Sequence, residues 1–195
     1  MTTDSFLIVG LGNPGRQFRD SRHNVGFMLV ERLAEQAMAA QWRAQARALV
    51  TSIALDDHKV LLAKPQTYMN LSGQSVHGLV NFYKLPLEKL LVAHDDLDLP
   101  FGTLRLRPAG GPGGQKGMAS AIDYLGTREF PRLRIGIGRP PGRMDPAAYV
   151  LQSFTRDELE SLPEVLGRAS DAVGAFVRHG LDRAMNLFNA DIRSE

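Results

Sequence analysis

The sequence predicts an α/β protein with a mixed β-sheet. Short apolar runs typical of buried strands alternate with segments in which apolar residues recur every three or four positions, as in amphipathic helices. Two of the runs are joined by a short polar turn, which predicts a hairpin and therefore an antiparallel pair. No repeat or low-complexity linker interrupts the 195 residues, so we expect one domain over 1–195.

The expected elements follow from these patterns in chain order. The strand-like segments are 6–11, 47–55, 59–64, 89–94, 103–107 and 132–138, and the helical ones are 24–40, 72–83, 117–125 and 156 to about 178. Asp56-Asp57-His58 supplies the hairpin turn. The last helix opens with Thr155-Arg156-Asp157-Glu158, a capping box. We expect Gly180 to end this helix and Pro163 to kink or restart it.

Composition excludes several classes of function. The chain has no cysteine, so disulfides, thiolate catalysis and cysteine metal sites are absent. Residues 1–5 carry no basic segment, and the apolar run that follows is too short for a signal or membrane segment, which predicts a cytoplasmic protein with no membrane partner. The net charge of +2 is unevenly distributed, because residues 100–143 carry +6 and the remainder −4. This segregation is typical of a polyanion-binding protein, or of a basic surface without a partner.

A histidine lies just before the first predicted helix, in Arg22-His23-Asn24. A lone histidine there is ordinarily a helix cap or a buried neutral side chain. Asp95, however, follows the strand 89–94, and sites of open α/β sheets gather at the carboxyl ends of strands. A carboxylate can fix the tautomer of an imidazole and stabilise its cation. His23 and Asp95 are therefore candidate dyad partners, and without cysteine or a G-x-S-x-G motif the natural nucleophile is water.

Dinucleotide binding and metal binding are both less consistent with the spacing of the residues that they would need. Residues 10–15 match the G-x-G-x-x-G dinucleotide pattern, but the helix is expected only after His23 and no acid ends the second strand. Asp95, Asp96 and Asp98 could ligate a hard cation, but they match no calcium-loop spacing. We expect neither a nucleotide cofactor nor a metal.

Residues 64–73 form a strand end, a loop and a helix start. Asn70 or Ser72 could cap the helix. In the functional interpretation, Asn70 directs a carboxamide into a cleft beside Tyr68 and Met69, where an amide can donate to an oxygen that gains negative charge.

Arginines on two predicted strands flank a glycine-rich loop. Arg105 and Arg107 share one face of a strand about 7 Å apart, near the separation of neighbouring phosphates. Arg132 and Arg134 repeat this spacing. The loop between them, 109–117, lacks the G-K-[S/T] of a phosphate-binding loop, and its glycines allow either a mobile flap or close approach of a ligand.

Several separated blocks together resemble bacterial-type peptidyl-tRNA hydrolases. They are residues 7–15, 22–26, 68–73, 93–100, 132–138 and 150–151. The resemblance implies a single α/β domain with a twisted mixed sheet flanked by helices, no metal or cofactor, and hydrolysis of the ester that joins a peptide to the 3′ ribose of tRNA. Nothing in the sequence demands an oligomer, so we expect a monomer.

The resemblance assigns roles by position. It makes His23 the general base and Asp95 its partner. Peptide and reacting carbonyl would be held by Asn13, Tyr68, Met69 and Asn70. Phosphates of the tRNA acceptor stem and 3′ end would be bound by Arg105, Arg107 and Arg134.

The chain departs from the family pattern at four positions. Phe18 and Ser21 replace a usual Tyr and Thr. Gln115-Lys116 replaces a usual His-Asn, and a protonated lysine cannot accept a hydrogen bond. Lys116 is therefore expected to bind substrate in a different way from that asparagine. The alternative function is an RNA-binding relative that has lost efficient catalysis.

Overall fold

A computed structural model describes residues 4–39 and 41–190. Its centre is a seven-stranded mixed sheet in the order β2-β3-β4-β1-β5-β7-β6. The strands are β1 Ser5–Gly10, β2 Arg43–Gln45, β3 Ala48–Leu55, β4 His58–Pro65, β5 Leu90–Asp96, β6 Leu104–Arg107 and β7 Arg132–Gly136. The β4–β1, β1–β5 and β5–β7 pairs are parallel, whereas β2–β3, β3–β4 and β6–β7 are antiparallel. The expected α/β class with a mixed sheet is confirmed.

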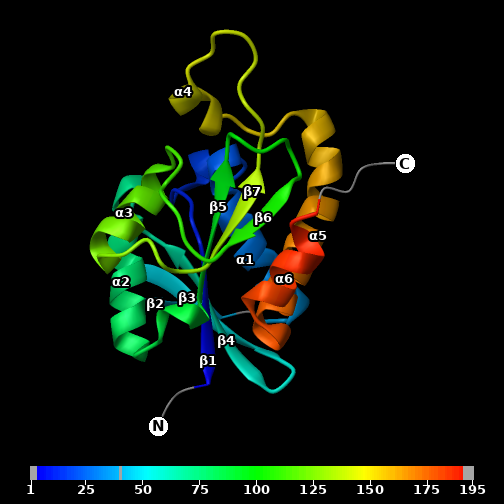
Figure 1. Cartoon of the computed structure of the whole chain (residues 1–195). Coiled ribbons are helices and arrows are strands. Elements are labelled where there is room, and N and C mark those ends of the chain that lie inside the picture. The colour runs from blue at the N-terminus through cyan, green and yellow to red at the C-terminus, as the bar shows by residue number, and fades with distance from the viewer. Residues whose placement is uncertain (1–3, 40, 191–195) are drawn as a thin grey trace.

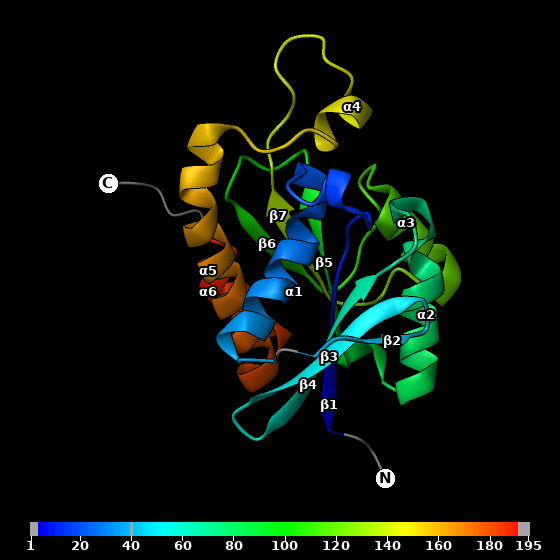
Figure 2. The same ribbon diagram turned by 180° about the vertical axis from the view of Figure 1, so that it is seen from behind.

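Helices cover both faces of this sheet (Figures 1 and 2). They are α1 Val25–Gln36, α2 Ser72–Tyr83, α3 Lys116–Leu125, α4 Pro146–Val150, α5 Arg156–His179 and α6 Leu181–Phe188. One core packs α1, α5 and α6 against one face, and a second core packs α2 and α3 against the other. Among the described residues, no helix is both long and apolar enough to span a membrane.

The predicted elements are all present; α2 has the predicted bounds 72–83, and the others have shifted ends. The predicted helix 24–40 ends at Gln36, and Ala40 lies outside the described residues, as do 1–3 and 191–195 of the predicted domain. The strand predicted at 89–94 continues to Asp96, so Asp95 lies within β5 and not after it. Elements β2, α4 and α6 were not predicted, because each is too short for a strong periodic pattern.

Helix α5 is continuous from Arg156 to His179, so a restart at Pro163 is wrong. Proline cannot donate to the carbonyl of Leu159, so one hydrogen bond of the helix is missing at this point. The capping box of Thr155 and Glu158 is confirmed. Gly180 ends the helix with a φ of 84°, as expected.

Close packing places the start of α1 against the central strands. A Cβ at Gly26 would lie 2.6 Å from the carbonyl oxygen of Ala93 and 2.6 Å from the amide nitrogen of Leu11. Only glycine permits this approach. The turn that precedes α1 is thereby held beside the carboxyl end of β5, which is where the candidate site lies.

Candidate active site

His23 and Asp95 meet at the carboxyl end of the sheet. His23 lies in a 3₁₀ turn, Arg22–Asn24, directly before α1, and its Nδ1 is 2.8 Å from Asp95 Oδ2. Their relative exposures are 9% and 2%. An ionised carboxylate only accepts hydrogen bonds, so the neutral imidazole carries its proton on Nδ1 and keeps the Nε2 lone pair to accept a proton. The alternative in which His23 caps α1 is wrong, because the N-cap is Asn24 and α1 has no side-chain cap.

Asn13 is held in one orientation by its neighbours. The side chain of Asn24 binds the backbone of Asn13. Its Oδ1 accepts from the backbone N–H of Asn13 at 2.8 Å, and its Nδ2 donates to the backbone carbonyl of Asn13 at 2.9 Å. The Asn13 side-chain oxygen accepts from the backbone N–H of Met69, also at 2.8 Å. Because Oδ1 is occupied in this way, Nδ2 is the end of the carboxamide that can donate to a ligand.

Asn13, His23 and Asp95 line a cleft of about 610 Å³. The cleft brings together all seven residues predicted for catalysis and for binding of the peptide: Asn13, His23, Tyr68, Met69, Asn70, Asp95 and Lys116. Met69 is buried, whereas Tyr68 is 62% exposed at the rim. Asn70 and Lys116 are exposed. The alternative in which Asn70 or Ser72 caps α2 is wrong, because the N-cap is Leu71 and Ser72 Oγ donates to the carbonyl of Met69.

One wall of the cleft was missed in the sequence. It is formed by Leu97 and by Asp145–Leu151, a segment that includes α4. Asp145 caps this helix through its side chain, and Pro146 is its first residue. An Asp-Pro pair of this kind is a helix-start pattern that could have indicated α4.

Four arginines lie on one face of the β6–β7 pair. Arg105 is directly opposite Arg134, and Arg107 is opposite Arg132. Cross-strand partners share a face of the sheet. The three predicted phosphate-binding arginines, Arg105, Arg107 and Arg134, therefore lie on the same face. Arg134 Nε pairs with Asp96 Oδ2 at 2.7 Å, an ion pair that does not use its two terminal nitrogens.

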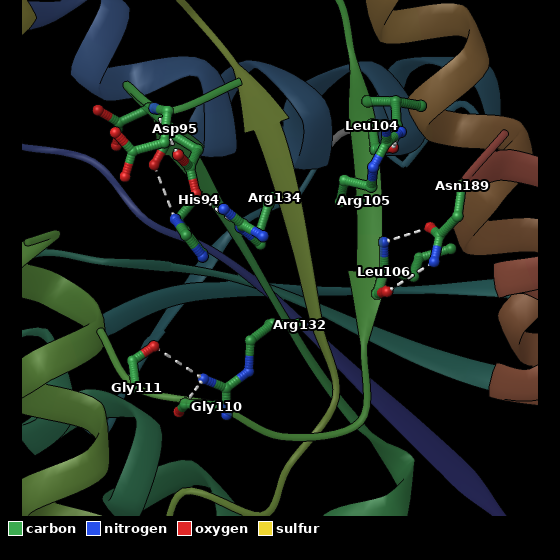
Figure 3. A network of polar contacts seen from close by, with 12 residues as sticks. His94, Asp95, Leu104, Arg105, Leu106, Gly110, Gly111, Arg132, Arg134 and Asn189 are labelled. Atoms are coloured by element: carbon green, nitrogen blue, oxygen red, sulfur yellow. Dashed lines mark hydrogen bonds and ion pairs between the residues drawn. The ribbon is translucent and has the colours of Figure 1, made fainter. Parts of the chain in front are cut away.

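Arg132 is not a surface residue, and its sequence-based pairing with Arg134 as a phosphate-binding unit is wrong. It is 2% exposed and donates to the carbonyls of Arg128 and Phe130. It also donates to the carbonyls of Gly110 and Gly111, as Figure 3 shows. Burial lowers the pKa of its guanidinium to about 10. Arg132 therefore anchors the start of the glycine-rich loop to β7.

The acidic residues at the end of β5 and just beyond it accept hydrogen bonds from neighbouring donors. Asp95 accepts from His23 and Gln115, Asp96 from Arg134 and the Asp98 amide, and Asp98 from Arg139. Within residues 4–39 and 41–190, no cluster of three or more His, Cys, Asp or Glu side chains could hold a metal ion.

The glycines of residues 10–15 do not open a helix. Helix α1 begins at Val25, and the intervening loop contains only 3₁₀ turns. A dinucleotide site would need a helix N-terminus at these glycines to meet a pyrophosphate. The structure thus supports the interpretation of this segment as a strand end and a loop, of which Asn13 lines the cleft.

Fold and cleft together define an α/β enzyme with a histidine–carboxylate pair at the carboxyl end of its sheet, a class that performs acid–base chemistry. The family model of peptidyl-tRNA hydrolase matches residues 7–195. The chain belongs to the peptidyl-tRNA hydrolase family.

Individual relatives agree with this assignment. Peptidyl-tRNA hydrolase of Chloroflexus aurantiacus is 52% identical over 185 residues, covering 94% of this chain and 98% of the relative. The chloroplastic peptidyl-tRNA hydrolase of Arabidopsis thaliana is 49% identical, covering 94% of this chain and 64% of the relative. The crystal structure of peptidyl-tRNA hydrolase from Acinetobacter baumannii superposes with a TM-score of 0.89 at 35% identity, covering 97% of each chain. The resemblance expected from the sequence blocks is confirmed.

Proposed function

We propose that this chain hydrolyses the ester between a peptide, or an N-blocked amino acid, and the 3′ ribose of tRNA, with His23 as general base and Asp95 as its partner. The observation that carries the proposal is the 2.8 Å contact between His23 Nδ1 and Asp95 Oδ2 inside the cleft. Family membership supplies the reaction.

In the proposed mechanism, His23 Nε2 removes a proton from a water molecule as the water oxygen attacks the ester carbonyl. Asp95 stabilises the imidazolium that forms. The tetrahedral intermediate then collapses, the C–O bond to the ribose breaks, and the imidazolium returns the proton to the 3′ oxygen. One ester and one water become a carboxylic acid and a free ribose hydroxyl, so atoms and charge balance.

In the proposed complex, the carboxamides of Asn13 and Asn70 bind the peptide and the reacting carbonyl, beside Tyr68 and Met69. Asn13 supports this role because Met69 holds its oxygen, which leaves an amide donor for a developing oxyanion. Lys116 lies at the first turn of α3 and lines the same cleft. As a cation it can stabilise the oxyanion or a terminal phosphate, but it cannot orient water as an acceptor.

The tRNA acceptor stem is assigned to Arg105, Arg107 and Arg134. The register of β6 and β7 supports this assignment, since it gathers the three guanidinium groups on one face of the sheet. Asp96 links this face to the dyad, because it binds Arg134 and is adjacent in sequence to Asp95. Phosphates bound there would lead the 3′ end of the tRNA toward His23.

The decisive experiment is single-turnover hydrolysis of N-acetyl-aminoacyl-tRNA by the parent protein and His23→Ala. We expect turnover by the parent and a loss of about 10²–10⁴-fold in the variant, with tRNA binding retained. A parent protein that retains tRNA without releasing the amino acid would instead be an RNA-binding relative. We also propose that the protein is a cytoplasmic monomer, which sizing at several concentrations and cell fractionation would check.

A further inference from the structure

Gln115 contacts the carboxylate oxygen of the proposed dyad that His23 does not contact. Asp95 Oδ2 faces His23 Nδ1 at 2.8 Å, and Asp95 Oδ1 accepts from Gln115 Nε2 at 3.1 Å. Gln115 is 8% exposed and lies in the cleft. The two oxygens of one buried carboxylate are thus held by two different side chains.

The orientation of the Gln115 amide is set by helix α3. Gln115 is the N-cap of α3, and its Oε1 accepts from the backbone N–H of Met118 at 2.7 Å. A flipped amide would turn NH₂ toward that N–H and an oxygen toward the Asp95 carboxylate, and both contacts would be repulsive. Nε2 also lies 3.3 Å from Met69 Sδ, a weak acceptor. The helix N-terminus therefore fixes which end of Gln115 faces Asp95.

We infer that Gln115 is a positioning residue that orients Asp95 toward His23. This inference rests on the proposed function. Asp95 can rotate about its Cβ–Cγ bond, and a second donor on Oδ1 restricts that rotation to the arrangement in which Oδ2 meets Nδ1. A carboxamide has no ionisable proton, so the restraint that Gln115 places on Asp95 does not depend on pH.

A pair of substitutions separates this role from helix capping. Gln115→Ser keeps an N-cap oxygen for the Met118 amide but is too short to reach Asp95. Gln115→Ala loses both contacts. If Gln115 acts through Asp95, Gln115→Ser lowers kcat by about 10- to 100-fold, the loss expected for a hydrogen bond to a charged group, with little change in KM. We expect a lower Tm for Gln115→Ala than for Gln115→Ser.

The coupling to Asp95 is tested in a double-mutant cycle. Adding Gln115→Ser to Asp95→Ala should cause no further loss of kcat, because no carboxylate remains to be positioned. An unchanged kcat in Gln115→Ser, or the same fold loss with and without Asp95, would overturn the inference. If Gln115→Ser fails to fold, Gln115→His serves instead: a neutral imidazole can accept from Met118 and donate to Asp95, so kcat must stay near that of the parent, and a large loss counts against the inference.

Failure of the proposed function would give a different result. The parent protein would then release no amino acid from N-acetyl-aminoacyl-tRNA, whatever the residue at 115. An active parent whose kcat is insensitive to Gln115→Ser would leave the proposed function intact and remove only this inference.

Discussion

The imidazole of His23 and the carboxylate of Asp95 are 72 residues apart in the chain and 2.8 Å apart in space. The contact exists because β1 and β5 are adjacent parallel strands and the loop after β1 returns to their carboxyl ends before α1 begins. The same loop carries Asn13, so the sheet order places a base, its partner and an amide donor in one cleft. The following predictions test what each contact contributes.

The first prediction concerns the free end of the Asn13 carboxamide. Asn13→Asp keeps an oxygen that accepts from the Met69 amide but removes the Nδ2 donor. We expect kcat to fall about 10²–10³-fold, as on loss of one oxyanion donor. Thermal unfolding of the same variant, compared with Asn13→Ala, checks that the framework persists. Parent-like turnover by Asn13→Asp would remove this side chain from the oxyanion site.

The second prediction concerns the arginine face. Arg105→Ala and Arg107→Ala should each raise KM for the tRNA substrate and reduce the slope of log KM against log salt concentration by about 1 per lost phosphate contact. The matched control is Arg183→Ala, an exposed arginine on α6, which packs on the opposite face of the sheet. If both face variants retain the KM of the parent at every salt concentration, the phosphate assignment is wrong.

The third prediction concerns Arg22, which ties the turn of His23 to the start of α5. It is 3% exposed, donates to Glu158 at 2.9 Å and to the Ser153 carbonyl at 3.0 Å, and stacks 4.1 Å from the ring centre of Tyr149. Arg22→Ala removes the donor to the Ser153 carbonyl and one of the two donors to Glu158, and should lower the free energy of unfolding by about 3 kcal/mol.

Thr155→Ala is the comparison for Arg22→Ala, since it removes only the side-chain cap of α5 and should cost about 1 kcal/mol. Urea denaturation of both variants gives the two values. An Arg22→Ala variant no less stable than Thr155→Ala would show that the buried ion pair contributes little.

The fourth prediction concerns His94, which is buried in β5 and whose Nδ1–H donates to the Asp95 carbonyl. Burial lowers its pKa below the ordinary value of 6.5. Below pH 6.5 the unfolded chain therefore binds a proton at His94 that the folded chain does not, so this contribution to stability is complete above pH 6.5 and is lost as the pH falls.

His94→Asn removes the titration while its Nδ2 can take the place of the Nδ1 donor. The free energy of unfolding, measured in urea from about pH 5 to 8, where histidine titrates, should decline less steeply toward acid in His94→Asn than in the parent. Identical slopes for the two proteins would mean that His94 is protonated in the folded state as readily as in the unfolded one.

Local patterns were sufficient to predict most of the secondary structure. Period-two and period-3.6 patterns record which side of a segment is buried, and a capping box such as Thr155 with Glu158 depends only on residues three apart. The strands other than β2, the long helices and the hairpin of β3 and β4 follow from such short-range information. The candidate residues of the cleft were predicted from the separated sequence blocks that resemble the family, because these blocks occur in the same order along this chain.

The sequence by itself thus determined the α/β class, the family and the set of candidate residues. Only the tertiary structure decided which of them touch. The spacing of Arg132 and Arg134 predicts the same role for both. In the structure, Arg132 is buried and donates to backbone carbonyls, whereas Arg134 forms an ion pair with Asp96. The contact of Gln115 with Asp95 likewise depends on where α3 begins relative to β5. The physical reason is that burial and long-range hydrogen bonds are set by strand order and helix packing, which spacing along one segment does not encode.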